Sequence, residues 1–103
     1  MGQDRQAGTT VVRVTGETDL ESAQRLRTEL ETAIVQAPGD VVVDLTGLVF
    51  CDSSGLNALL AARLLAQERG RVLRLAGPSR QVLRLLEMTG AKDLFPIDAA
   101  PPA

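Results

Sequence analysis

Two serines between a carboxylate and a glycine, in the run Asp52-Ser53-Ser54-Gly55, form the segment of this sequence best suited to carry chemistry. The segment separates an apolar stretch from an apolar helix pattern, and Asp, Ser and Gly all favour helix N-caps. One interpretation is therefore structural, with these residues simply beginning the helix. The other is functional. A helix N-terminus offers free N–H groups and the positive end of the helix dipole, so a serine there could carry a phosphate without unfolding the domain.

The composition argues against most catalytic and metal sites. The chain of 103 residues has no His, which removes the commonest general base at neutral pH and the commonest metal ligand. Its single cysteine, Cys51, excludes an intrachain disulfide and a cysteine zinc site, and its apolar neighbours predict a buried small side chain. P-loop and Gly-x-Gly-x-x-Gly motifs are absent, and the serines have no nearby activating base. We therefore expect no enzyme, no cofactor and no metal.

Charge and hydropathy limit the classes of partner. Lys and Arg total 11 against 13 Asp and Glu, so there is no basic excess for a nucleic-acid surface. With no Trp, no Tyr and two Phe, the chain also lacks stacking platforms for single strands. No apolar run reaches the roughly 18 residues of a membrane span, and the polar N-terminus has no signal-peptide core. We expect a cytoplasmic protein without direct nucleic-acid binding or membrane insertion.

Strand and helix patterns alternate along the chain. Strands or short extended pieces are expected at 9–15, 41–45, 71–76 and 94–97. The consecutive apolar residues at 41–45 indicate a strand covered on both faces, as in a parallel sheet. This order predicts an α/β fold, with a small mixed sheet of four to five strands and amphipathic helices packed on it.

Three helix patterns lie between these strands. The first begins at Leu20, where Thr18 as N-cap and Glu21 three residues on have the spacing of a capping box. The second begins near Leu56, is apolar over most of its surface and is expected to be largely buried. The third opens with Ser79 and ends before Gly90. The predicted core comprises Leu26, Leu30, Val43, Leu60, Leu64 and Leu86.

One domain is expected over residues 9–97. Residues 1–8 are polar, have no strand pattern and are expected to form a flexible N-terminus or a weak edge strand. Residues 98–103 hold two prolines and no packing pattern, and they are expected to form a flexible tail.

Three motifs occur in the order Gly16-Glu17-Thr18-Asp19, Val41-Val42-Val43-Asp44-Leu45 and Asp52-Ser53-Ser54-Gly55-Leu56. In this order and at the distances that separate them, they together resemble the STAS domain. The similarity is greatest to the bacterial anti-sigma factor antagonists. The similarity covers about residues 9–97. The stretches 71–76, 83–86 and 88–90 are also similar to that family.

The resemblance implies a switch protein without catalysis of its own. In that family the unphosphorylated antagonist binds an anti-sigma factor that is also a serine kinase, and a sigma factor is released. Phosphorylation of the Ser that follows the motif Asp ends binding, and a PP2C-type phosphatase restores it. Carried over, the acceptor is Ser53, with Ser54 as second choice. The implied partner-binding residues are Asp19, Asp52, Ser53, Ser54, Gly55 and Asn57.

Three departures from the family pattern concern partner fit and the edges of the fold, and two alternatives to the switch also stay open. Asn57 stands where the family usually has a small residue, often Gly, which could alter partner fit. The first strand pattern is missing, and residues 99–103 replace a final helix. One alternative is a structural STAS subunit resembling that of the bacterial phospholipid-transport ABC complex, and the other is a scaffold in a stress-sensing assembly. The Ser53-Ser54 pair favours the switch, because a purely structural cap needs no acceptor.

Overall fold

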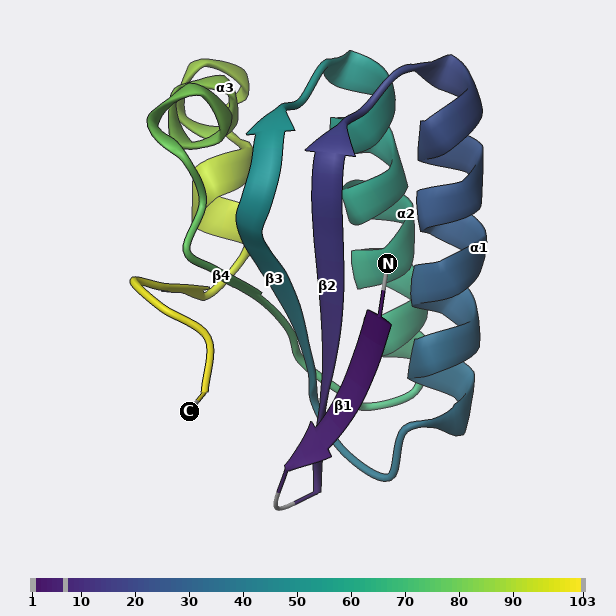
Figure 1. Ribbon diagram of the computed structural model, residues 1–103. Coiled ribbons are helices and arrows are strands. Elements are labelled where there is room, and N and C mark those ends of the chain that lie inside the picture. The colour runs from purple at the N-terminus through teal and green to yellow at the C-terminus, as the bar shows by residue number, and fades with distance from the viewer. Residues whose placement is uncertain (1, 7, 103) are drawn as a thin grey trace.

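A mixed five-stranded sheet forms the frame of the protein (Figure 1). The computed structural model describes residues 2–6 and 8–102, with the backbone alone at 4–6. The strands lie side by side in chain order: β1 (Gly2–Gln6), β2 (Thr9–Glu17), β3 (Val41–Phe50), β4 (Leu73–Ala76) and β5 (Ile97–Asp98). β1 is antiparallel to β2, and the other neighbouring pairs are parallel. The predicted α/β fold with a mixed sheet is confirmed.

Two helices, α1 (Leu20–Gln36) and α2 (Ser53–Glu68), run side by side over one face of the sheet (Figure 1). Each follows directly from a strand, α1 from β2 and α2 from β3. Because β2 and β3 are parallel, both helices begin at the same edge of the sheet, beyond the carboxyl ends of these strands. The third helix, α3 (Arg80–Thr89), follows β4 and leads into the 3-10 turn η1 (Ala91–Leu94). This topology places the two helix N-termini next to each other.

The hydrophobic core lies between the sheet and these helices. Four predicted core residues are confirmed as buried, namely Leu26, Leu30, Val43 and Leu86. Leu60 is half-buried against the core, whereas Leu64 is 57% exposed, so the prediction for Leu64 is wrong. The reason is geometric: α2 is apolar around most of its circumference, but the sheet and α1 cover only part of it. The prediction of a largely buried second helix therefore holds for one side only.

The opposite face of the sheet carries ion pairs beside a small apolar cluster of Val11, Val42 and Ala76. Arg74 makes two hydrogen bonds of 2.9 and 2.8 Å to the carboxylate of Asp98, and Arg13 lies 4.0 Å from Asp44. The Arg74 bonds hold the pKa of Asp98 below its ordinary value. Alternation along the strands thus separates an apolar face under the helices from a more polar face.

Several element boundaries differ from those expected. β3 continues to Phe50 rather than ending at Leu45, because its outer half pairs with β2 as far as Glu17. β1 is a strand without an apolar pattern, held by backbone pairing along β2. Asp98, the first residue of the predicted tail, belongs to β5. Met1, Ala7 and Ala103, from the predicted flexible ends, lie outside the described residues.

The third helix matches its sequence pattern at both ends. Ser79 is the N-cap, and its side chain accepts a hydrogen bond from the N–H of Val82. Gly90 is the C-cap and has a φ of 77°, a left-handed conformation that glycine adopts without strain. Local capping chemistry therefore predicts both ends of α3.

Candidate functional site

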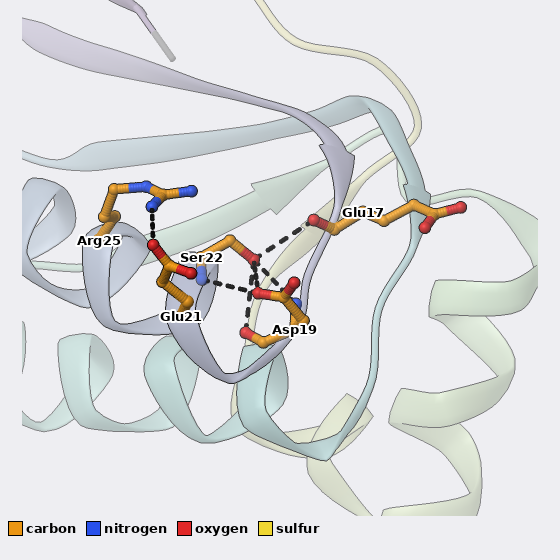
Figure 2. A network of polar contacts seen from close by, with 5 residues as sticks. All are labelled: Glu17, Asp19, Glu21, Ser22 and Arg25. Carbon is orange, nitrogen blue, oxygen red and sulfur yellow. Dashed lines mark hydrogen bonds and ion pairs between the residues drawn. The ribbon is translucent and has the colours of Figure 1, made fainter.

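Asp19 caps α1 through bonds within its own helix (Figure 2). The Ser22 N–H donates to Asp19 Oδ1 at 2.8 Å, and the Asp19 N–H donates to Ser22 Oγ, also at 2.8 Å. This reciprocal pair is a capping box in which Ser22 takes the place that Glu often occupies. Hydrogen bonds from the Ser22 N–H and hydroxyl lower the pKa of the exposed Asp19 carboxyl.

The predicted N-cap, Thr18, is wrong by one residue. Thr18 is only 6% exposed, and Glu21, its expected box partner, pairs with Arg25 instead. The Thr18 N–H donates to the carbonyl of Phe50 at 3.0 Å, which extends the pairing of β2 and β3 and turns the threonine side chain inward. Thr18 therefore belongs to the junction between the two strand ends, and the helix begins after Asp19.

Asp52 caps α2, as the sequence allows. Its Oδ1 accepts a hydrogen bond from the Gly55 N–H at 3.1 Å. The Asp52 N–H donates to Thr18 Oγ1 at 3.2 Å, and the same hydroxyl lies 3.4 Å from Asp52 Oδ1. The cap of α2 is thereby connected to the segment that leads into α1, and Asp19 is the next residue after the connecting threonine.

Gly55 lies where the backbone of α2 passes closest to that junction. A Cβ atom at this position would lie 2.5 Å from Thr18 Oγ1 and 2.8 Å from Cys51 Sγ. Neither contact leaves room for a methyl group beside buried neighbours. The glycine of the motif is therefore required by close packing, in addition to any part it has in partner binding.

Cys51 is buried, as its sequence context predicts. Burial raises the pKa of its thiol, which disfavours the thiolate. The backbone of Cys51 is held by the side chain of Gln81 in α3: Oε1 accepts from the Cys51 N–H, and Nε2 donates to the Cys51 carbonyl, each at 2.9 Å. Sequence reasoning missed Gln81 because no local pattern connects residues 30 positions apart.

The two serines have different surroundings at the start of α2. Ser53 is its first residue and is exposed, whereas Ser54 is half-buried. Ser54 and the exposed Asn57 line one wall of a groove of about 180 Å³ between α1 and α2. The other wall belongs to α1 and includes Arg27. The cap bonds of α2 use Asp52, Gly55 and Thr18, so the Ser53 hydroxyl is left out of them.

Large apolar side chains stand exposed near the same edge of the sheet. Leu20, the first residue of α1, and Val49, near the end of β3, are each 68% exposed, and Phe50 is partly exposed as well. Such side chains beside polar helix caps suit contact with another protein. The structure thus gathers the predicted site residues at one edge: Asp19, Asp52, Ser53, Ser54, Gly55 and Asn57.

Within 2–6 and 8–102, no group of three or more His, Cys, Asp or Glu side chains is arranged to hold a metal ion. In the same part of the chain, no helix combines the length and the apolar character needed to cross a membrane.

Comparison with known proteins finds a matching family model and several relatives. A family model described as "Mlab, STAS domain" matches residues 1–96. The anti-sigma F factor antagonist of Paenibacillus polymyxa is 32% identical over 91 residues, which cover 87% of this chain and 78% of the relative. The anti-sigma-B factor antagonist of Bacillus subtilis is 31% identical over 88 residues, with coverage of 85% and 80%. Both relatives are named as antagonists of anti-sigma factors.

The fold is also similar to that of a solved antagonist. Superposition on the anti-sigma factor antagonist SpoIIAA in its unphosphorylated form gives a TM-score of 0.78 at 23% identity, covering 93% of this chain and 85% of SpoIIAA. The phosphorylated form of the Bacillus protein gives 0.71 at the same identity, with coverage of 93% and 88%. The chain therefore belongs to the STAS-domain family, in its group of anti-sigma factor antagonists.

Proposed function

We propose that this protein is a switch whose unphosphorylated form binds a kinase-type anti-sigma factor and thereby frees a sigma factor. Phosphorylation of Ser53 ends that binding, and a PP2C-type phosphatase restores it. The observation that carries the proposal is the exposed Ser53 hydroxyl, directly after the N-cap Asp52 and outside the cap bonds of α2. The antagonist names of the relatives and the two phosphorylation forms of SpoIIAA support it.

Ser53 fits the acceptor role better than Ser54. A kinase must bring its active site around the hydroxyl, which requires access from several directions. Ser53 is exposed at the tip of the helix, whereas Ser54 is half-buried in the wall of the groove facing α1. A phosphate on Ser54 would enter a narrow space, so we assign the modification to Ser53.

The domain tolerates a phosphate at Ser53. The modification adds about −1.5 to −2 charges at neutral pH. At the first position of α2 these charges face free backbone N–H groups and the positive end of the helix dipole, an arrangement that favours an anion by roughly 0.3–1 kcal/mol. The folded state is therefore retained, and the effect of the modification falls on the partner.

The partner surface proposed here comprises Ser53 with Asp19, Asp52, Ser54, Gly55 and Asn57. In a contact shaped for a hydroxyl, a phosphate beside Asp52 introduces steric conflict and a local excess of negative charge. Like-charge contact in an interface costs several kcal/mol. Shifting occupancy from about 99% to about 1% requires roughly 10⁴-fold in affinity, or about 5.5 kcal/mol. One phosphate at the centre of a contact supplies an effect of that order.

Affinity capture with wild type and three variants of the full chain tests the proposal. Wild type and Ser53→Ala are expected to retain an anti-sigma factor kinase, whereas Ser53→Asp loses it while remaining folded. Gln67→Glu, an exposed position near the far end of α2, adds the same charge as a control and should bind like wild type. Phosphosite mapping after incubation with that kinase and ATP should place the phosphate on Ser53.

Other outcomes identify the alternatives. Phosphate on Ser54 alone would reassign the acceptor. Capture of an ABC-transporter ATPase by wild type and Ser53→Asp alike would contradict the switch and favour a structural STAS subunit. Capture of a stress-sensing assembly without an anti-sigma factor would favour a scaffold.

A further inference from the structure

We propose that Thr18 and Gln81 are positioning residues, which hold the Cys51–Asp52 segment from two sides and thereby orient Ser53. The inference rests on the proposed function, because it concerns the presentation of the same acceptor. Its structural basis is independent of any partner. The two side chains come from the β2–α1 connection and from α3, which lie 34 and 30 residues away along the chain.

Thr18 completes the cap of α2 in place of a residue of that helix. In a capping box, the side chain at the third helical position accepts a hydrogen bond from the N–H of the cap residue. In α1 this acceptor is Ser22. In α2 the third position is Gly55, which has no side chain, and the Asp52 N–H instead donates to Thr18 Oγ1 at 3.2 Å. The cap that precedes Ser53 is therefore complete only when β2 and α1 are in place.

Gln81 holds the other side of the segment as a neighbouring strand would. The pairing of β3 with β4 ends at Asp44 and Ala76, so Cys51 lies beyond the reach of β4. The Gln81 side-chain amide accepts from the Cys51 N–H and donates to the Cys51 carbonyl, with both distances 2.9 Å. A side-chain amide thus replaces one peptide unit of the missing strand. Without the Gln81 amide, the N–H and the carbonyl of the buried Cys51 both lose their hydrogen-bond partner.

Together the two side chains restrict the segment at consecutive residues. Thr18 binds the N–H of Asp52, and Gln81 binds the N–H and carbonyl of Cys51. Ser53 follows immediately, so its direction is set by the peptide units that these bonds hold. Neither side chain belongs to the hydrophobic core, and within the segment only Cys51 does. We therefore expect that removing either side chain lets the segment open while the rest of the core between sheet and helices stays folded.

The single cysteine reports such opening directly. Cys51 is the only thiol in the chain and is buried in the segment, so iodoacetamide reacts with it only when the segment opens. Alkylation rates of the full chain at fixed pH, divided by the rate in urea-unfolded protein, give the open fraction. We expect Gln81→Met to raise this fraction about tenfold or more, equivalent to about 1.4 kcal/mol. Thr18→Val should have a similar effect, and Thr18→Ser, which keeps the hydroxyl, should restore the wild-type rate.

Matched controls separate local opening from general destabilisation. Gln67→Met and Thr28→Val make the same chemical changes at exposed positions, and both should label like wild type. Ile34→Val weakens the buried core near the end of α1 and lowers the urea midpoint without touching the segment. It should leave native labelling at the wild-type rate until global unfolding sets in. The inference would be overturned if Gln81→Met and Thr18→Val were alkylated at rates within twofold of wild type. It would also be overturned if their alkylation were no faster than global unfolding permits.

A second measurement connects the opening to function. With the kinase captured by wild type, kcat/KM for Ser53 phosphorylation should fall several-fold in Gln81→Met and Thr18→Val, because the lost bonds also loosen Ser53 in the closed state, but not in Ile34→Val or Thr18→Ser. Faster labelling together with unchanged phosphorylation and binding would show that the two side chains hold the segment without orienting the acceptor, which refutes the positioning role. If no kinase is captured, the proposed function fails, and the labelling experiment still decides whether Thr18 and Gln81 hold the segment.

Discussion

The N-termini of α1 and α2 lie next to each other and are both capped by aspartate, yet they are built differently. In α1, Asp19 and Ser22 exchange hydrogen bonds within four residues of one another. In α2, Asp52 accepts from Gly55, but its own N–H depends on Thr18. One cap is therefore local, and the other is assembled from segments far apart in the sequence.

The difference explains how one helix start can be structural and the other functional. At the start of α1, the Ser22 hydroxyl is already engaged in the hydrogen bonds of the cap. At α2 the cap bonds are supplied by the Asp52 carboxylate and by the Thr18 hydroxyl, so the two serines of the motif are not needed for capping. A phosphate on Ser53 can then be added or removed without breaking a hydrogen bond of the cap.

The largest expected effect comes from giving α2 the third residue of the α1 cap. Gly55→Ser places a Cβ atom 2.5 Å from Thr18 Oγ1 and 2.8 Å from Cys51 Sγ, so the junction must shift. Overpacking of this kind costs typically about 1–3 kcal/mol. The reverse change, Ser22→Gly, loses bonds of a half-buried residue and meets no clash, so it should cost about 0.5–1 kcal/mol. Urea unfolding of both variants measures the two losses, and equal losses would contradict the comparison.

Removing each aspartate should give the next largest contrast. Asp52→Ala loses the bond from Gly55 and the neighbouring Thr18 hydroxyl, and we expect a loss of about 1–2 kcal/mol in the free energy of unfolding. Asp19→Ala affects an exposed cap whose side-chain bonds come from Ser22 of the same helix, and a smaller loss is expected. Thermal unfolding of the pair is the measurement. A greater loss for Asp19→Ala would mean that the local cap dominates.

What the sequence predicts well is local. A helix start within Asp52-Ser53-Ser54-Gly55, the ends of α3 at Ser79 and Gly90, and the burial of Cys51 follow from chemistry within a few residues, and the structure agrees. The parallel strand at Val41 was recognisable from its consecutive apolar residues for the same reason. These features position most of the candidate site.

What the sequence could not predict depends on neighbours distant in the chain. The cap template fits Thr18 with Glu21 as well as Asp19 with Ser22, and only the bonds of Thr18 to Phe50 and Asp52 decide between them. Exposure of Leu64 depends on which side of α2 faces the sheet and α1. β1 is a strand because its backbone pairs with β2, and its sequence has no apolar pattern that would indicate this pairing.

Two buried threonines, Thr10 and Thr18, test the role assigned to Thr18, because replacing each with Val should change the stability of the protein in opposite directions. Thr10 is 1% exposed, and its hydroxyl has no hydrogen-bond partner among the described residues. Thr10→Val removes an unpaired buried group at nearly constant shape and should stabilise the protein by about 1 kcal/mol. Thr18→Val removes a paired hydroxyl and should destabilise by about 1 kcal/mol. Urea midpoints give both signs, and stabilisation by Thr18→Val would contradict its place in the α2 cap.

The smallest expected effect is a pH dependence specific to the local cap. Bonds from Ser22 hold the pKa of Asp19 below its ordinary value, so its ionised form is favoured in the folded state. The resulting stability is fully present above the unfolded-state pKa, and it is lost as pH falls through the lower, folded-state pKa. Asp19→Asn keeps a good N-cap without a titrating group. Wild type should therefore lose stability relative to Asp19→Asn below about pH 4.

Asp98, whose pKa is lowered by Arg74, is present in both proteins, so its contribution cancels in the difference between their stabilities. Urea unfolding of both proteins from pH 7 to pH 3 measures it, and a difference that stays constant over this range would show that the Asp19 charge adds nothing to the cap.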